Sequence, residues 1–293
     1  MKKFIIKGPN KAVKGNVKIS GAKNSCLPLM AASILFKNKV ILKNVPFVKD
    51  VITMKDLLSS LGAKVVFSES KKIMTITNKK NHKLIVPYKL VSTMRAGVLT
   101  MGSLLGRYPQ KKIKVALGGG CALGIRDTSW HLAGFKSLGA KNTLDKGYVN
   151  IYSKHGLAGS VYKFPKVTVT GTSNLIMASI FVKGRHIIKN ISIEPEVIDL
   201  INFLNNSGAN IKFLGKRSII IKGVKELVNG KHTIIGDRIE AFSYLCVGVI
   251  TNGKININNI NPNNLKSEIE ILKKIGCKIE SNDNSIKLIS SKN

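Results

Sequence analysis

The sequence is poor in aromatic residues, in acidic residues and in arginine. Of its 293 residues, 6% are aromatic, and 15 Asp and Glu stand against 48 Lys and Arg. Only six of these cations are Arg, and the lysines are spread along the whole chain. A nucleic-acid surface would concentrate its cations and interleave them with aromatic side chains on which bases stack. The net charge of +33 therefore predicts easier capture of anions such as phosphates, and we expect no nucleic-acid partner.

Long apolar runs are also absent. The longest nearly uninterrupted one covers residues 26–36, about half of the roughly 20 residues that a membrane-spanning helix needs. The start, Met1-Lys2-Lys3 followed by Phe4-Ile5-Ile6, is too short in its apolar part for a secretory signal. We therefore expect a cytoplasmic protein with no membrane partner.

Cysteine is scarce and scattered. No two of the four cysteines have the CxxC spacing that is typical of zinc or thioredoxin-like sites. We accordingly predict no metal site and no cofactor, and a reducing compartment argues against disulfides. Cys26, Cys246 and Cys277 lie in apolar segments, and we interpret them as packing residues.

A weak internal repeat organises the chain. A turn of the Gly-Ala-Lys type, between an expected helix and an expected strand, occurs four times, at Gly62, Gly139, Gly208 and Gly276. Glycine just beyond a helix end is the left-handed cap position. We predict an α/β (α+β) fold of inside-out repeats with the order βαβαββ, apolar helices inside and sheets outside. A chain of this length can bury cores in two domains.

The first repeat shows the expected order in detail. Its strands are predicted at 15–20, 40–45, 64–67 and 73–76, and its helices at 26–36 and 51–61. The third repeat is expected to open with a strand at Lys166 and to continue with helices at 175–182 and 197–206. The fourth is expected to begin at His232.

The first motif lies where the first strand should meet the first buried helix. It reads Ile19-Ser20-Gly21-Ala22-Lys23-Asn24, and such a turn offers free amides, a cation and a polar side chain to an anion. On spacing alone, a capped helix with an exposed Lys is the simpler interpretation. Extended through residues 27–32, the motif closely resembles the opening motif of the UDP-N-acetylglucosamine 1-carboxyvinyltransferase family, in the EPSP synthase superfamily. The resemblance implies that Lys23 contacts phosphoenolpyruvate and that Asn24 helps to hold the sugar nucleotide.

The second motif is a glycine-rich loop, Gly118-Gly119-Gly120-Cys121, followed by Arg126. The glycines allow the loop to carry its thiol to a ligand, and a thiol is a suitable acid for protonating an enol-type carbon. The motif alone leaves open a glycine hairpin with an incidental Cys. It resembles the active-site loop of the same family, which implies that Cys121 is the general acid and that Arg126 binds phosphate. In the family an acidic residue usually stands at a fixed position after this loop. Here the chain continues with residues 127–129, Asp-Thr-Ser, so the acid is not in its usual place.

Arginine is so rare that its positions are informative. Arg95, Arg126 and Arg238 fall within motif-like segments. Guanidinium binds carboxylate or phosphate through a planar fork that Lys cannot copy. The family resemblance implies that Arg95 contacts the sugar nucleotide or phosphoenolpyruvate, and that Lys49 also binds substrate.

A further segment resembles the stretch that cradles the uridine diphosphate in the family. It implies binding roles for Lys166, Thr168 and Val169. The pattern departs from the family in two places, because Thr168 replaces the usual Ser and Thr170 the usual Gly. These changes put the nucleotide contact in question.

Two acidic segments have both a functional and a structural interpretation. The Glu-Pro-Glu element at 194–196 matches the family and implies that Glu194 and Glu196 lie near the active site; alone, it is a helix start with Pro at the first position. The segment at 236–240 also matches and implies that Asp237 binds substrate. Its Asp-x-x-Glu spacing equally predicts a capping box.

Family members have six repeats, three per domain, and this sequence shows four. We expect one domain at 23–236, with three repeats and the Cys121 loop, and a partial second domain formed by 1–22 and 237–293. The part not found includes a Phe-Pro-Thr-Asp element whose Asp is thought to deprotonate the sugar hydroxyl. The resemblance implies transfer of the enolpyruvyl group of phosphoenolpyruvate to the 3-hydroxyl of UDP-N-acetylglucosamine, with release of phosphate. This is the first committed step of peptidoglycan synthesis.

Several alternatives stay open on the sequence. The chain could be an inactive remnant, or one half of an enzyme whose other part a second polypeptide supplies. A basic nucleic-acid-binding protein is the alternative of another class. A sister enzyme that uses shikimate phosphate fits less well, because the Gly-Cys loop and the Gly-Ala-Lys-Asn motif point to the sugar nucleotide.

Overall fold

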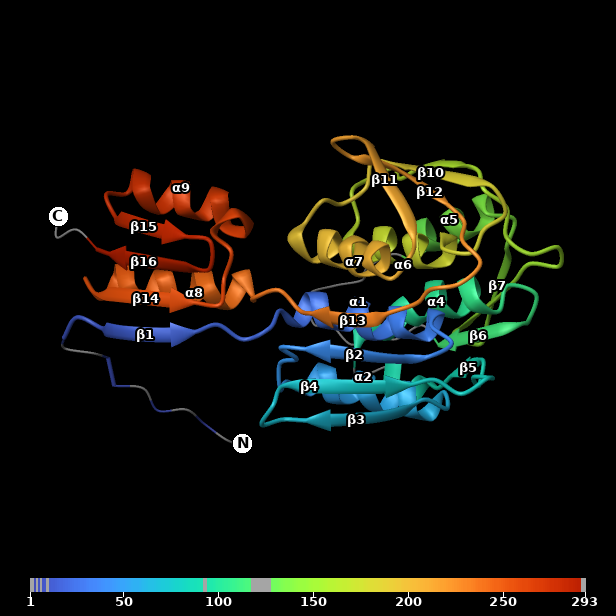
Figure 1. Ribbon diagram of the computed structural model, residues 1–293, viewed down its shortest axis with the longest axis horizontal. Coiled ribbons are helices and arrows are strands. Elements are labelled where there is room, and N and C mark those ends of the chain that lie inside the picture. The colour runs from blue at the N-terminus through green and yellow to red at the C-terminus, as the bar shows by residue number, and fades with distance from the viewer. Residues whose placement is uncertain are drawn as a thin grey trace. The chain divides into compact units, whose positions relative to one another are not determined.

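The computed structural model describes residues 11–91, 94–116 and 128–290, together with Lys3, Ile5, Lys7 and Gly8; of Arg95 only the backbone is described. The chain forms two compact units. We call residues 23–234 the large unit, and residues 1–22 with 235–293 the small unit (Figure 1). Cys121 and Arg126 lie outside the described residues.

The described part of the large unit contains three four-stranded sheets of one design. The strand orders are β13-β2-β4-β3, β5-β6-β8-β7 and β9-β10-β12-β11. In each sheet the first two strands are parallel and the remaining neighbours are antiparallel. The strands are β13 Gly230–Thr233, β2 Lys39–Lys43, β4 Ile73–Thr77, β3 Lys64–Ser68, β5 Ile85–Val86, β6 Ile113–Ala116, β8 Tyr148–Tyr152, β7 Lys141–Asp145, β9 Val161–Lys163, β10 Arg185–Lys189, β12 Ser218–Lys222 and β11 Asn210–Gly215.

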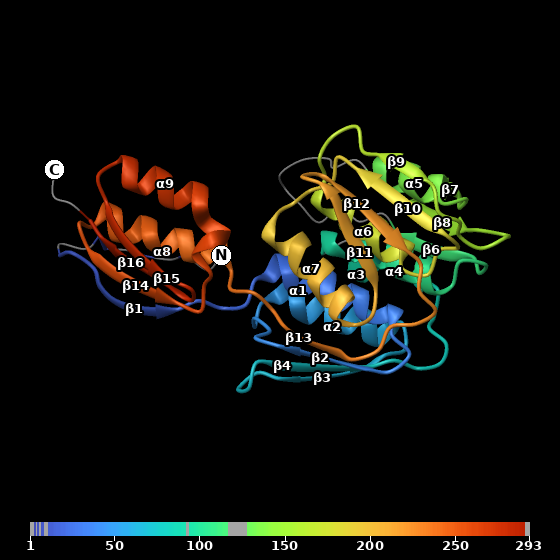
Figure 2. The same ribbon diagram turned by 45° about the horizontal axis from the view of Figure 1, so that its top comes forward.

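The helices of the large unit lie between these sheets (Figures 1 and 2). They are α1 Lys23–Ala32, η1 Ser33–Leu35, α2 Lys49–Ser60, α3 Tyr88–Val91, η2 Arg95–Leu99, α4 Thr100–Arg107, α5 Ser129–Ser137, α6 Val169–Ser179 and α7 Pro195–Asn206. Three of them, α1, α4 and α6, are buried on all sides over 25–32, 100–106 and 171–179. The predicted inside-out fold, with apolar helices inside and sheets outside, is confirmed.

Glycine allows α4 and α6 to approach each other backbone to backbone. A side chain at Gly102 would overlap with the carbonyl oxygen of Asn174 in α6. The Asn174 side chain is fully buried, and its Oδ1 accepts a hydrogen bond from the Gly102 N–H at 2.8 Å while its Nδ2 donates to the Val98 carbonyl at 3.0 Å. This amide therefore fixes α6 against the start of α4.

The small unit has the same design, with one sheet and two helices. The sheet order is β1-β14-β16-β15, and β1 is parallel to β14. The elements are β1 Lys14–Lys18, α8 Arg238–Ile250, β14 Lys254–Asn258, η3 Pro262–Leu265, α9 Lys266–Lys274, β15 Lys278–Asn282 and β16 Ser285–Ile289. Its core includes Leu245, whereas Ile250 on another face of α8 is 80% exposed. In the part of the chain that the structure describes, no helix is both long and apolar enough to cross a membrane.

The four repeat markers behave as predicted. Gly62, Gly139, Gly208 and Gly276 have φ values of 104°, 89°, 97° and 94°, which is the left-handed conformation expected just beyond a helix end. Each follows the second helix of a repeat and precedes a strand.

Two expectations about the repeats were wrong. The third repeat does not open with a strand at Lys166: its first strand is β9, and α6 already begins at Val169, where the Thr168 side chain caps it. The fourth repeat does not begin at His232, because this residue lies in β13, which pairs with β2 in the first sheet. The small unit takes β1 as its first strand instead. The first and fourth repeats have thus exchanged their opening strands.

Candidate functional site

The predicted binding residues of the large unit lie at the starts of helices. Lys23 is the first residue of α1, Lys49 of α2, Arg95 of η2 and Val169 of α6, while Thr168 and Glu194 are the N-caps of α6 and α7. The start of a helix carries free backbone N–H groups and the positive end of the helix dipole. The starts of α1, α2 and α6 therefore favour an anionic ligand, whereas the start of α7 carries the Glu194 carboxylate.

An ion pair joins the starts of α1 and α2. The Lys23 ammonium lies 3.1 Å from the Asp50 carboxylate, and the two side chains are 43% and 35% exposed. A pair that is this open to water contributes no more than about 1 kcal/mol, so an anionic ligand can compete for Lys23. Asn24 is exposed beside it. Its carbonyl lacks the usual helical donor, because the residue four positions on is Pro28, which has no N–H.

A buried carboxylate, which the sequence reading did not assign, ties α1 to α7 and β13. Asp199 in α7 is 4% exposed and accepts a hydrogen bond from the Ser25 hydroxyl in the first turn of α1. Its other oxygen lies 2.7 Å from Nε2 of His232 in β13. We call these three residues the Asp199 network. It holds the chain two residues beyond Lys23.

Burial, with a smaller effect of Asp199, keeps the Cys26 thiol protonated. Burial, and after it the negative charge of Asp199, raise the pKa of the Cys26 thiol. A protonated thiol with no exposure to water is a packing group. Cys277 is also buried, and burial raises the pKa of its thiol.

The start of α6 is tied down by hydroxyl groups. Thr168 Oγ1 accepts from the Gly171 N–H at 3.2 Å, which is the N-cap contact. Thr172 Oγ1 accepts from the Ser192 N–H at 3.0 Å and so links α6 to the segment that leads into α7. Thr170, which replaces the usual Gly, places its hydroxyl 3.4 Å from Nε2 of His131. Lys166 lies exposed just before this helix start.

The acidic residues lie at helix starts, and the capping box predicted at Asp237 is half formed, because the Asp237 N–H donates to the Ser20 carbonyl and not to Glu240. Glu194 caps α7 with Pro195 in the first turn, and Glu196 is 4% exposed. Asp237 belongs to the small unit, where its side chain accepts from the N–H groups of Ile239 at 2.9 Å and Glu240 at 3.2 Å. The Glu240 carboxylate accepts instead from the Ser20 N–H at 3.0 Å. A contact of any of these acids with substrate stays a prediction.

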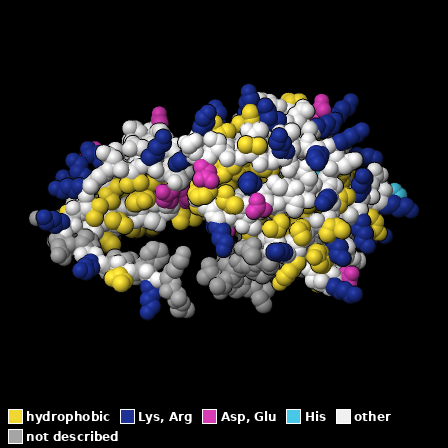
Figure 3. Space-filling view, turned by 90° about the horizontal axis from the view of Figure 1, so that it is seen from below, with side chains coloured by type: hydrophobic (Ala, Val, Ile, Leu, Met, Phe, Trp, Pro, Cys, Tyr) yellow, Lys and Arg dark blue, Asp and Glu magenta, His cyan; other side chains and the backbone are white. Residues whose placement is uncertain are grey.

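Nothing in the described ranges suggests a metal centre. Among the residues outside the gaps at 92–93 and 117–127, no three His, Cys, Asp or Glu side chains gather closely enough to hold an ion. Lysine and arginine side chains are scattered over the face shown in Figure 3, with no single basic patch.

Known proteins resemble the chain over its whole length. The family model of EPSP synthase (3-phosphoshikimate 1-carboxyvinyltransferase) matches residues 7–293. A curated protein of Pelagibacter ubique, named UDP-N-acetylglucosamine 1-carboxyvinyltransferase, is 44% identical over 100% of this chain and 69% of its own length. The protein of Magnetococcus marinus with the same name is 42% identical over 98% of this chain and 68% of its own length.

Solved structures show the same fold. The enolpyruvyl transferase NikO from Streptomyces tendae superposes with a TM-score of 0.83 at 17% identity, over 97% of this chain and 67% of its own. EPSP synthase from Acinetobacter baumannii gives a TM-score of 0.74 at 17% identity, over 96% of this chain and 65% of its own. The chain thus spans about two-thirds of the length of its relatives. It belongs to the EPSP synthase family, in the group of the UDP-N-acetylglucosamine 1-carboxyvinyltransferases.

Proposed function

We propose that the chain transfers the enolpyruvyl group of phosphoenolpyruvate to the 3-hydroxyl of UDP-N-acetylglucosamine and releases phosphate, which begins peptidoglycan synthesis. The observation that carries the proposal is the exposed Lys23–Asn24 pair at the start of α1, in a chain 44% identical to a curated transferase of that name. Both substrates are anions, and the starts of α1, α2 and α6 offer N–H groups and cations to them.

The reaction balances as an addition followed by an elimination. The sugar hydroxyl oxygen adds to C2 of phosphoenolpyruvate, its proton passes to a base, and C3 gains a proton from an acid. The C2–O bond to phosphate then breaks, C3 loses a proton, and phosphate leaves. In this scheme Cys121 is the acid at C3, while Lys23 and Arg126 hold the charge of the phosphate. The roles of Arg95, Lys49 and Lys166 as further anion contacts rest on the family resemblance.

The relatives are longer than this chain, and the proposed reaction also needs groups that lie in their remaining third. Those groups would include the base for the sugar hydroxyl. Either the same polypeptide or a second one would supply them. The cytoplasmic location expected from the sequence likewise stays a prediction.

Phosphate release is the direct test. The chain is assayed with phosphoenolpyruvate and UDP-N-acetylglucosamine, alone and with a polypeptide that corresponds to the remaining third of the Pelagibacter ubique protein. We expect release that needs both substrates, that Cys121→Ala abolishes, and that Lys23→Ala reduces roughly a hundredfold. Lys64→Ala, at an exposed position of β3, is the matched control and should leave the rate unchanged.

Two outcomes would count against the proposal. Release with shikimate 3-phosphate in place of the sugar nucleotide would assign the chain to the sister reaction. No release under either condition, together with no binding of UDP-N-acetylglucosamine in calorimetry, would identify an inactive remnant.

A further inference from the structure

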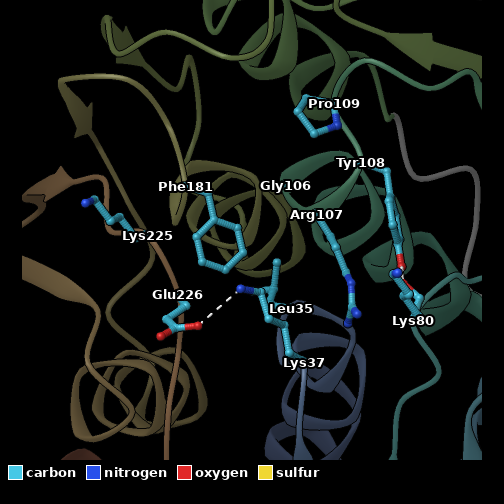
Figure 4. Close-up of a pocket in the computed structure, with 10 residues that line it drawn as sticks. All are labelled: Leu35, Lys37, Lys80, Gly106, Arg107, Tyr108, Pro109, Phe181, Lys225 and Glu226. Atoms are coloured by element: carbon cyan, nitrogen blue, oxygen red, sulfur yellow. Dashed lines mark hydrogen bonds and ion pairs between the residues drawn. The ribbon is translucent and has the colours of Figure 1, made fainter.

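A cavity lies in the large unit, away from the candidate site residues. This pocket of about 650 Å³ is lined by residues at the far ends of the buried helices: Leu35 follows α1, Gly106 and Arg107 end α4, and Phe181 follows α6 (Figure 4). An α-helix of ten residues is about 15 Å long, so the pocket and Lys23 lie at opposite ends of α1. None of the predicted site residues lines it.

The inner wall of the pocket is apolar. Figure 4 shows the Phe181 ring beside Leu35, which is 2% exposed, and Pro109 lies on another side. At Gly106, α4 packs closely against its neighbours, because a Cβ there would lie 2.6 Å from the Met177 carbonyl oxygen and 3.2 Å from Leu35 Cδ2. Leu35, Phe181 and Pro109 give this wall the character of a site for an apolar group.

The mouth of the pocket carries more positive than negative charge. Lys37, Lys80, Arg107 and Lys225 line it, with Glu226 as the one carboxylate among the lining residues. The Lys37–Glu226 ion pair is 3.2 Å long, but its side chains are 69% and 55% exposed, so it is readily opened. For Lys80 and Lys225, the described residues provide no carboxylate within ion-pair distance.

Arg107 is already committed to the protein backbone. Its Nη1 donates to the carbonyl oxygens of Ile34 and Phe36 at the end of η1. Beside it, the Tyr108 hydroxyl lies 2.9 Å from Nδ1 of His82. These bonds hold one side of the pocket in place, and they leave Lys80 and Lys225 as the cations available to a ligand. An apolar wall with exposed lysines at the mouth of the pocket suits an amphiphilic anion.

We propose that this pocket binds a small soluble molecule with an aromatic or short acyl body and one phosphate group. The body lies against Leu35 and Phe181, and the phosphate lies at Lys80 or Lys225. A volume of about 650 Å³ matches the size of pockets that enclose small organic ligands. The inference does not rest on the proposed function, because no residue of the candidate site takes part.

Calorimetry on the whole chain tests the proposal, with 1-naphthyl phosphate as the probe. We expect saturable binding, at least about tenfold tighter than that of inorganic phosphate or of 1-naphthol, because each control lacks one half of the recognition. The double substitution K80E and K225E should weaken binding by about tenfold or more, and F181A should also weaken it. The matched control, K141E and K212E, makes the same charge change at exposed strand positions of the large unit and should leave the affinity unchanged.

Several results would overturn the proposal. One is no saturable binding of the probe, and another is equal weakening in both double variants, which would indicate the overall charge alone. Binding that Lys23→Ala abolishes and K80E with K225E preserves would place the probe at the candidate site. Binding to vesicles of anionic phospholipid, without binding of the soluble probe, would assign the pocket to a lipid. Circular dichroism checks that each variant is folded.

Discussion

Replacing Asp199 by Ala tests whether the Asp199 network stabilises the start of α1. The substitution removes the acceptor of the Ser25 hydroxyl and the partner of His232 Nε2, in a site where the carboxylate is 4% exposed. A hydrogen bond to a charged group contributes about 1.5–3 kcal/mol, and the substitution removes two of them. We expect the free energy of unfolding of the large unit to fall by about 3–5 kcal/mol.

The measurement is urea unfolding, monitored by circular dichroism. If the two units unfold in two transitions, each transition is fitted by itself. Asp199→Asn keeps the shape and one oxygen acceptor, so it should lose less than Asp199→Ala. Asp145→Ala, at an exposed position of β7, is the control and should change the free energy of unfolding by no more than about 0.5 kcal/mol.

The reasoning fails if Asp199→Ala costs less than about 1 kcal/mol, because the desolvation of the carboxylate would then cancel its hydrogen bonds. If the Asp199 network also positions the start of α1 for the ligand, a second result is expected. In the milder variant Asp199→Asn, the affinity for UDP-N-acetylglucosamine should fall at a temperature where the protein remains folded. An unchanged affinity would limit the Asp199 network to a structural role.

Three further perturbations follow from buried groups. Burial lowers the pKa of His186 to about 4, and its Nε2 has no hydrogen-bond partner among the described residues. The unfolded chain therefore binds a proton below pH 6.5 that the folded chain binds only near pH 4. His186 should contribute about 2 kcal/mol to the stability lost in urea unfolding between pH 7 and 5. His186→Gln should remove this contribution and leave that of His82, whose pKa burial also lowers to about 4. Gly102→Ala forces a methyl group into the Asn174 carbonyl, so the melting temperature should fall, at a cost of about 1–3 kcal/mol or more. Leu245→Ala should cost about 2–5 kcal/mol, whereas Ile250→Ala on the same helix should cost less than about 0.5 kcal/mol, as urea unfolding would show.

Local features of the fold could be predicted because local chemistry determines them. Gly62 and the three other marker glycines adopt the left-handed conformation because they lack a Cβ, and this preference does not depend on distant parts of the chain. The buried helix α1 follows from an apolar run that leaves no polar face. The strand expected at Lys166 failed for an equally local reason: Thr168 caps a helix, and a run of β-branched residues concealed that signal.

Strand pairing was harder, because it is not local. The segment of β13 carries no mark that separates pairing with β2 from pairing within the small unit. The Asp199 network escaped prediction for the same reason. Its contacts join Ser25, Asp199 and His232 from α1, α7 and β13, and no spacing in the sequence signals such a contact. The position of Lys23 at a helix start could be predicted, because that start lies within one short motif.

The repeat explains why the predicted site residues, so far apart in the sequence, share one kind of position. Lys23, Arg95 and Thr168 each lie where a strand's connection enters the first buried helix of a repeat, and Lys49 and Glu194 lie where the second helix begins. In the second and third sheets the two strands that precede these helices are parallel. Parallel neighbours present their carboxyl ends at one edge, so both helix starts of a repeat must lie at that edge. In the second and third repeats this arrangement places the starts of both helices at one edge, where their backbone N–H groups are available to an anion.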